Sequence, residues 1–316
     1  MQIGYHASHE QFAPSRLLGL ARQAEQAGFD ALLSSDHFAP WSVRQGQSGF
    51  AWAWLGAAVT ATGLPCGVVA APGQRYHPAV LAQAIATVAE LATAPFTVAL
   101  GSGQALNEHV TGGFWPPKPV RNARLAECAG VIRRLLAGET VDHDGLVRVH
   151  AARLWSLPAA PPPLFGAALS PETAAEVAAW ADGLITVHGP HVGEVVGAFR
   201  DAGGAGKPVH VQVHLSWAPD EDAARAAALD QWRLNALPPI LNEELSLPEQ
   251  VDAAAAHVPA EALEDSVVIS ADLGRHADVL AGYERLGVER LYLHHVGRDQ
   301  ERFVGTFGEQ VLPRLR

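Results

Sequence analysis

The fold is decided by one stretch, residues 66–100, which reads CGVVAAPGQRYHPAVLAQAIATVAELATAPFTVAL. Its two ends, Cys66 to Ala70 and Phe96 to Leu100, are short apolar runs, and Ala79 to Ala92 between them is rich in good helix formers. The two runs are apolar at consecutive positions, as in strands that are buried on both faces of a parallel sheet. The stretch therefore predicts a strand, a helix and a second, parallel strand.

The same unit of a strand and a helix recurs along the chain. About eight strands are predicted, and most are followed by a helical run: Gln2–His6, Ala31–Ser35, Cys66–Ala70, Phe96–Leu100, Leu164–Leu169, Leu184–Val187, Val209–Ser216 and Arg290–His294. Repeated units with this many buried strands predict an α/β fold, the (β/α)8 TIM barrel. A doubly wound parallel sheet is the alternative.

Two segments interrupt this rhythm. Residues 140–156 contain the pair Asp144-Gly145, which favours a tight turn, and they predict a β-hairpin. Residues 236–259 predict a longer, partly helical insertion. No linker divides the chain, so we expect one barrel domain over residues 1–316 that carries these two insertions.

Composition limits the partners and the compartment. The chain has 22 Lys and Arg against 33 Asp and Glu, a formal net charge of −11, which argues against binding to nucleic acid or to an anionic membrane surface. We find no apolar run of transmembrane length and no signal peptide. Cys66 and Cys128 lie in apolar runs and form no disulfide framework. These features predict a cytoplasmic protein.

Polar side chains gather where the predicted strands end, which is where a barrel places its active site. One such residue alone is more often a strand cap or a loop residue, but the clustering across many strands favours a site. The residues include His6, His9, Glu10, Asp36, His37, Gln104, Asn107, His109, His294 and His295.

Two classes of enzyme fit such a cluster. A flavin- or deazaflavin-dependent oxidoreductase uses polar side chains to orient its cofactor and substrate. A metal-dependent hydrolase uses His and carboxylate ligands. The hydrolase is the weaker alternative, because the spacing of His6 and His9 places their side chains on opposite faces of a strand. We therefore predict no metal ligands.

Two further stretches fit a cofactor. The stretch from Gly101 to Glu108, GSGQALNE, is a glycine-rich turn after a strand, where a planar or phosphate-bearing group can approach the backbone. It does not complete the dinucleotide fingerprint, and an ordinary tight turn explains it equally well. Ser170-Pro171 begins a helix after a late strand, where free N–H groups can bind a phosphate or simply receive a helix cap.

Four stretches resemble the luciferase-like flavin- and deazaflavin-dependent oxidoreductases. They are GYHASHEQFAP at residues 4–14, SDHFAPW at 35–41, QRYHP at 74–78 and GSGQALNE at 101–108. The most similar branch is that of the deazaflavin-dependent glucose-6-phosphate dehydrogenases. The resemblance covers nearly the whole chain. It implies a (β/α)8 barrel, hydride transfer and a homodimer.

The resemblance also implies roles for single residues. His37 matches a proton-transferring histidine, while Glu10 and Trp41 match active-site residues, and we expect His109 to be a further titratable group of the same pocket. The cofactor-binding residues implied are Asp36, Val68, Val69, Ser102, Gly103, Gln104, Asn107, Leu169 and Ser170. A non-proline cis peptide bond is expected near Val68 and Val69.

Two departures from the family bear on the chemistry. Gln104 stands where the family has an acid–base Glu, and an amide does not exchange a proton near neutral pH. Pro190, Ala253 and Ser266 stand where the family has three basic residues that bind the sugar phosphate, so glucose 6-phosphate is not the expected substrate. We predict hydride transfer between FMN and a small organic molecule. Coenzyme F420 is the alternative cofactor, and an FMN-dependent monooxygenase is the alternative activity.

Overall fold

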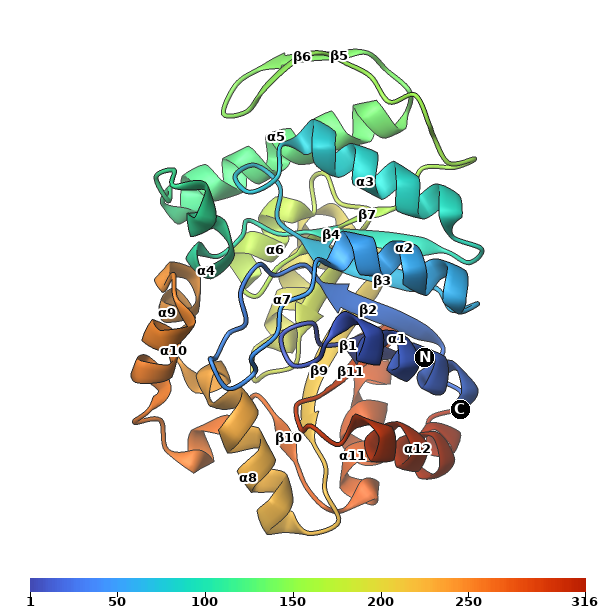
Figure 1. Cartoon of the computed structure of the whole chain (residues 1–316), viewed down its shortest axis with the longest axis vertical. Helices are drawn as coiled ribbons and strands as arrows, with labels where there is room; N and C mark the ends of the chain where they lie inside the picture. Colours follow the sequence, from blue (N-terminus) through green and yellow to red (C-terminus); the bar gives the residue numbers. More distant parts are fainter.

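Eight parallel strands close into a barrel that helices surround (Figure 1). The computed structural model describes residues 1–316, apart from the side chain of Ala260. Around the barrel the strands follow the order β9, β11, β1, β2, β3, β4, β7, β8, and β8 pairs with β9 to close the ring. Their bounds are β1 Gln2–Ala7, β2 Ala31–Ser35, β3 Cys66–Ala70, β4 Phe96–Leu100, β7 Leu164–Ala167, β8 Gly183–Val187, β9 Val209–Ser216 and β11 Arg290–His295. The prediction of a (β/α)8 barrel is confirmed, and a doubly wound sheet is excluded because the ring is closed.

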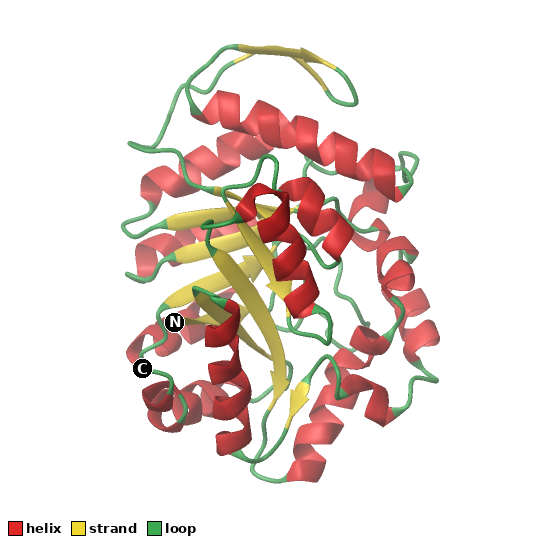
Figure 2. Ribbon diagram, turned by 180° about the vertical axis from the view of Figure 1, so that it is seen from behind, coloured by secondary structure: helices red, strands yellow, loops and turns green.

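The helices pack outside the strands, as the view from behind shows (Figure 2). Several of these helices have proline in their first turn, which fixes where the helix begins. The pyrrolidine ring of proline holds φ at its helical value, and no backbone N–H is needed at this position. The helices are α1 Pro14–Gln26, α2 Ala51–Ala61, α3 Pro78–Leu91, α4 Ala105–Glu108, α5 Lys118–Leu136, α6 Pro171–Val177, α7 Val192–Phe199, α8 Glu221–Trp232, α11 Leu273–Ala281 and α12 Gln300–Gln310. Among these described helices, none has the length and apolar character needed to cross a membrane.

Both predicted insertions contain the expected structure. In the first, β5 Val141–Asp144 and β6 Arg148–Ala152 form an antiparallel hairpin, which stands away from the barrel beyond α5 (Figure 1). In the second, α9 Pro239–Glu244 and α10 Pro248–Ala255 lie at the side of the molecule where α4 is found. The short strand β10, Val268–Ile269, which the sequence did not indicate, pairs with the end of β9.

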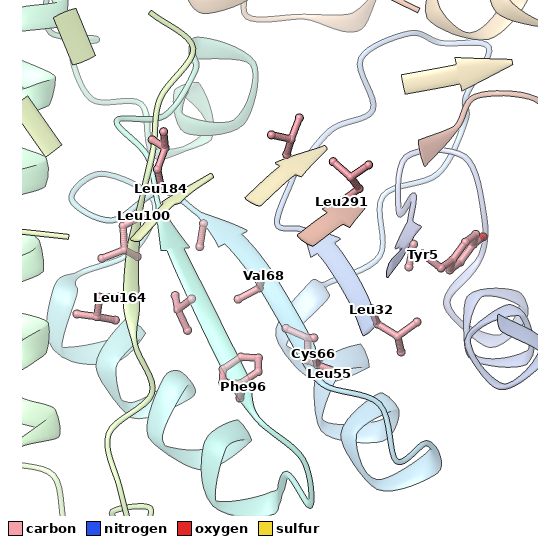
Figure 3. Packing of buried hydrophobic residues seen from close by; sticks show 14 of the residues in the cluster. Tyr5, Leu32, Leu55, Cys66, Val68, Phe96, Leu100, Leu164, Leu184 and Leu291 are labelled. Atoms are coloured by element: carbon pink, nitrogen blue, oxygen red, sulfur yellow. The ribbon is translucent and has the colours of Figure 1, made fainter. Parts of the chain in front are cut away.

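The side chains of the barrel strands alternate between two cores. The outward ones, such as Leu32, Val68 and Leu291, pack against the helices (Figure 3). The inward ones include Val69 and Tyr292 and fill the barrel itself. A Cβ atom on Gly4 would lie 2.5 Å from the Tyr292 ring, so only glycine at this position leaves room for that ring.

The prediction of a cis peptide bond near Val68 and Val69 was wrong. No peptide bond of the described residues is cis. Val68 pairs with Ser34 on one side and with Val98 on the other, and Val69 continues both ladders. This pairing with two neighbouring strands holds the segment as a regular, extended trans backbone.

Candidate active site

A carboxylate and an imidazole form the centre of the site. Glu10 lies in the loop after β1 and His37 in the loop after β2, and Glu10 Oε1 is 2.5 Å from His37 Nδ1. The Glu10 side chain is buried, whereas that of His37 is 17% exposed at the barrel opening. Ser8 donates a hydrogen bond of 2.9 Å to the other oxygen of Glu10, Oε2. Ser8 therefore fixes the buried carboxylate, and solvent or a ligand can reach the pair only at the His37 ring.

Glu10 remains ionised in spite of its burial. Burial alone raises the pKa of this carboxyl group, but His37 and the nearby His6 outweigh that effect and lower the pKa to about 2. At neutral pH the carboxylate is thus an acceptor that orients His37 and stabilises a positive charge on its ring. A His held in this way suits general acid–base catalysis.

Trp41 borders this pair. Its ring meets the His37 ring edge-on, with the ring centroids 5.2 Å apart and an angle of 88° between the planes. The Trp41 backbone N–H donates a hydrogen bond of 2.9 Å to the side chain of Gln45. The indole also packs against an apolar cluster that includes Leu234 and Val251. The structure therefore brings together three of the four predicted catalytic residues.

Asp36 anchors the loop that carries His37. Its carboxylate accepts hydrogen bonds from Trp52 Nε1 at 3.0 Å and from the Tyr76 hydroxyl at 3.1 Å. Arg75 pairs with the same carboxylate at 3.4 Å and donates to the backbone carbonyl of Asp36 at 2.6 Å. These contacts tie the β2 loop to the β3 loop. The Asp36 carboxylate is thus occupied in fixing the position of the loop that carries His37.

The glycine-rich loop after β4 folds over a second buried carboxylate. Gly103 has a φ of 80°, and a Cβ atom there would lie 3.2 Å from Glu108 Cγ. Glu108 accepts a 2.6 Å hydrogen bond from the Arg75 backbone N–H, and burial raises the pKa of Glu108. Ser102 and Gln104 are half-buried on either side of Gly103. A Cβ atom on Gly103 would also lie 3.3 Å from Ala71 and 3.5 Å from Trp115, so glycine at this position lets the loop pack closely against its neighbours.

Asn107 connects this loop to the loop of His37. Its Oδ1 accepts hydrogen bonds from the backbone N–H groups of Phe38 at 2.8 Å and Ala39 at 3.3 Å. Its Nδ2 donates to Gln104 at 3.5 Å. Asn107 therefore couples the predicted cofactor loop to the catalytic pair through the backbone.

Other predicted residues lie apart from this cluster. His109 Nδ1 is 3.1 Å from the carbonyl oxygens of Ala105 and Leu106, so the ring caps α4, and no contact among the described residues joins it to Glu10 or His37. Leu169 is 61% exposed in the loop after β7. Ser170 caps α6 by accepting a 3.3 Å hydrogen bond from the Thr173 backbone N–H. Val69 faces the barrel interior, whereas Val68 faces the helices.

Several polar residues of the site were not assigned a role from the sequence. Arg75 and Glu108 follow strands, but nothing in the sequence showed that they pair. Gln212 and His214 lie in the barrel interior, and a signal for them was present, because β9 reads VHVQVHLS with strict alternation. That pattern predicts one polar face on a strand that is buried on both sides. Within the described residues, no group of three or more His, Cys, Asp or Glu side chains is placed to bind a metal ion.

Comparison with known proteins agrees with this geometry. The family model of the luciferase-like monooxygenases matches residues 1–290. The chain belongs to this family. Membership makes it an oxidoreductase and removes the metal-dependent hydrolase as an alternative.

Two of the similar proteins belong to the deazaflavin branch of the family. An F420-dependent glucose-6-phosphate dehydrogenase of Nakamurella multipartita is 34% identical over 100% of this chain and 97% of the relative. The structure of an F420-dependent secondary alcohol dehydrogenase in complex with an F420–acetone adduct has a TM-score of 0.92 and 29% identity, covering 100% of this chain and 99% of that chain. The monooxygenase RslO1 from Streptomyces bottropensis shares the fold, with a TM-score of 0.74, 17% identity and full coverage of both chains.

Proposed function

We propose that this chain is an F420-dependent dehydrogenase that transfers a hydride between the deazaflavin and a small alcohol or its carbonyl product. One observation carries the proposal, namely the 2.5 Å contact between Glu10 and His37 beside Trp41. Alcohol oxidation releases a proton together with the hydride, and this pair is built to accept it. Both named relatives from the deazaflavin branch use F420, which supports F420 over the FMN predicted first.

The residues present fit a flat, mostly apolar ring. The interior side chains Val69, Ala99 and Ala167, which lie near the ends of β3, β4 and β7, are apolar. The groups that would hold F420 are those implied by the family resemblance: Asp36, Val68, Val69, Ser102, Gly103, Gln104, Asn107, Leu169 and Ser170. Bound F420 would supply the acceptor for the hydride.

The protein supplies proton transfer and orientation. His37 takes the hydroxyl proton of the substrate as the C–H bond breaks, and Glu10 stabilises the imidazolium that results. Trp41 shields one side of the substrate from water. Gln104 does not titrate, so it contributes hydrogen bonds only. His109, which caps α4, is the reserve candidate for proton exchange with solvent.

Glucose 6-phosphate is a poor candidate for the substrate. A dianion needs Lys or Arg partners. Arg75 is buried near the site, but Asp36 and Glu108 already neutralise it. The positions at which the family binds the sugar phosphate carry Pro190, Ala253 and Ser266.

A binding and reduction experiment tests the proposal. Titration of the purified protein with F420 and with FMN, followed by tryptophan fluorescence, should show roughly tenfold tighter binding of F420, or more. Propan-2-ol should then bleach the F420 absorbance, and glucose 6-phosphate should not. Tighter binding of FMN together with substrate-dependent oxygen uptake would instead establish the monooxygenase alternative.

We also propose a single barrel domain over residues 1–316 that forms a homodimer in the cytoplasm. The family resemblance supports the dimer, and the two free, buried cysteines, Cys66 and Cys128, fit a reducing compartment. Sedimentation equilibrium should give twice the monomer mass. A monomer mass would refute the dimer.

A further inference from the structure

The inside of the barrel is apolar on one side and polar on the other. Strands β2, β3, β4, β7 and β8 turn apolar side chains inward: Leu33, Val69, Ala99, Phe165, Ala167 and Ile185. The neighbouring strands β9, β11 and β1 contribute four polar side chains that contact one another, His6, Gln212, His214 and His294. We call these four residues the histidine wall.

The wall is a continuous set of contacts. The His294 ring lies 4.3 Å from the His6 ring and 5.1 Å from the His214 ring, measured between centroids. The side-chain nitrogen of Gln212 is 3.2 Å from His294 Nδ1 and 3.1 Å from His214 Nε2. Trp232 packs against His214 and His294 from behind. The wall is therefore held in place by packing and by the Gln212 amide.

Two nitrogen atoms of the wall lack partners. His6 and His214 are 2% and 5% exposed, and the Nδ1 atom of each has no hydrogen-bond partner among the described residues. Burial lowers the pKa of His6 to about 4 and that of His214 to about 3, and it also lowers the pKa of His294. Each ring is thus neutral at pH 7, with one donor and one acceptor. The wall offers hydrogen bonds without charge.

The wall adjoins the catalytic pair. His294 Nε2 lies 3.5 Å from the side-chain oxygen of Gln11, the residue after Glu10. His6 also helps to lower the pKa of Glu10. At neutral pH the described side chains of the wall carry no charge, and the adjoining Glu10 is a carboxylate. The wall therefore offers no cation to pair with an anionic substrate.

We propose that the histidine wall binds uncharged hydroxyl groups of the substrate, so that diols or polyols without phosphate are the preferred substrates. One hydroxyl group faces His37 and loses its proton, and a second forms a hydrogen bond with an imidazole of the wall, that of His6 or His214. A site built to bond a hydroxyl group discriminates strongly against an analogue that lacks it, because the partner groups are then left unpaired. This inference rests on the proposed function and names the substrate class.

The first test compares two alcohols of the same carbon skeleton. With F420, the ratio of kcat/KM for butane-2,3-diol to that for butan-2-ol should be roughly 10 or more in the wild-type enzyme. His214→Phe should lower this ratio toward 1. The matched control is His210→Phe, because His210 lies on the same strand but contacts Phe165 and Tyr292 deeper in the barrel. That control should keep the wild-type ratio.

The second test does not depend on turnover. In F420-free protein, butane-2,3-diol should shift the NMR signal of the His214 ring, assigned by its loss in His214→Phe, and butan-2-ol should not. A wild-type ratio near 1, or a His214 signal that ignores the diol, would show that the wall is merely hydrated and would overturn the inference. Failure to reduce F420 with any alcohol would instead refute the proposed function, and the NMR result would still decide the inference.

Discussion

At the scale of single residues, the proposed catalysis depends on Glu10, a carboxylate that is buried and still charged. Glu10 is ionised because His37 lies beside it. Ser8 and the surrounding barrel fix the Glu10 carboxylate, and Glu10 in turn orients the His37 ring. Removing one member of such a pair leaves the other without its partner in a buried site. The pair therefore acts as one unit.

Replacing His37 tests that unit. His37→Asn should keep the fold and F420 binding but lower kcat by roughly 100-fold or more, because a positioned acid–base group is lost. Stopped-flow reduction of F420 by propan-2-ol measures the effect. His150→Asn is the control, because that exposed histidine lies on the β5–β6 hairpin. A kcat within a few-fold of the wild-type value would show that the proton leaves by another route.

The sequence named Glu10 and His37 as active-site candidates, and the structure places them side by side. The sequence also pointed to His6 and His294 but not to the contacts that form the histidine wall. Glu10, His37 and Trp41 were found because they stand in stretches that resemble a known family. Gln212 and His214 stand in no such stretch, and their role appears only when β9 is placed beside β11 and β1. His109 was predicted to line the pocket, and the structure shows that its ring also caps α4, a contact that the sequence did not indicate.

At the scale of elements, the insertion with α9 and α10 supports the site. Asp252 on α10 accepts a 2.7 Å hydrogen bond from the Ser42 hydroxyl and one of 3.0 Å from the Val43 backbone N–H. These two residues follow Trp41 directly, and Trp41 packs against the apolar cluster that contains Val251 and Ala255 of the same helix. Helix α10 therefore holds the Trp41 loop from outside the barrel.

The other helix of the insertion is held by a buried cation. Arg121 on α5 is fully buried, lies 4.4 Å from the Trp115 ring, and pairs with Glu243 at 2.5 Å and Glu244 at 2.9 Å on α9. Lys118 adds a 2.7 Å pair with Glu243. The insertion is thus attached both to the segment after the glycine-rich loop and to the Trp41 loop.

Loosening α10 should disturb Trp41 without unfolding the barrel. Asp252→Ala should raise KM for the alcohol about tenfold with a smaller change in kcat, because the pocket wall is displaced while the Glu10–His37 pair is intact. Asp252→Asn should restore most of the loss, since its amide can still accept from Val43 and donate to Ser42. Glu249→Ala, an exposed position on the same helix, is the control. Equal KM values for Asp252→Ala and the control would refute this role.

At the scale of the whole molecule, many histidines are kept neutral by burial. Burial lowers the pKa of eight of them: His6, His9, His188, His210, His214, His276, His294 and His295. In the unfolded chain these groups titrate near the ordinary value of 6.5. Between that pH and about 4 the unfolded chain binds more protons than the folded one, so the free energy of unfolding decreases as the pH falls.

Acid should therefore destabilise the protein well above the pH at which carboxylates titrate. For His9, whose pKa is lowered to about 4, the loss at pH 4 is about 3 kcal/mol. Urea unfolding at pH 7.5, 6, 5 and 4 should show this fall in the free energy of unfolding. In His9→Leu the free energy should depend less steeply on pH, because one titrating group is missing. His150→Ala should keep the wild-type slope. A free energy of unfolding that is constant from pH 7.5 to 5 would contradict the account.

The barrel itself was predictable because its signals are local and repeated. Strands such as β3 and β4 are apolar throughout, and the βα units alternate regularly. The expected cis bond near Val68 failed because the ladders on both sides of β3 favour a regular strand. The strand β10 escaped prediction because its two residues have no pattern of their own and depend on pairing with the end of β9.

Deuterium transfer tests the central claim most directly. Propan-2-ol labelled with deuterium at its second carbon should reduce F420 in the presence of the enzyme, and mass spectrometry should find one deuterium on the reduced cofactor. The label should persist because the deazaflavin accepts the hydride on carbon, where it does not exchange with water. Reduced F420 without deuterium, or F420 that stays oxidised while FMN and oxygen support substrate turnover, would contradict the account.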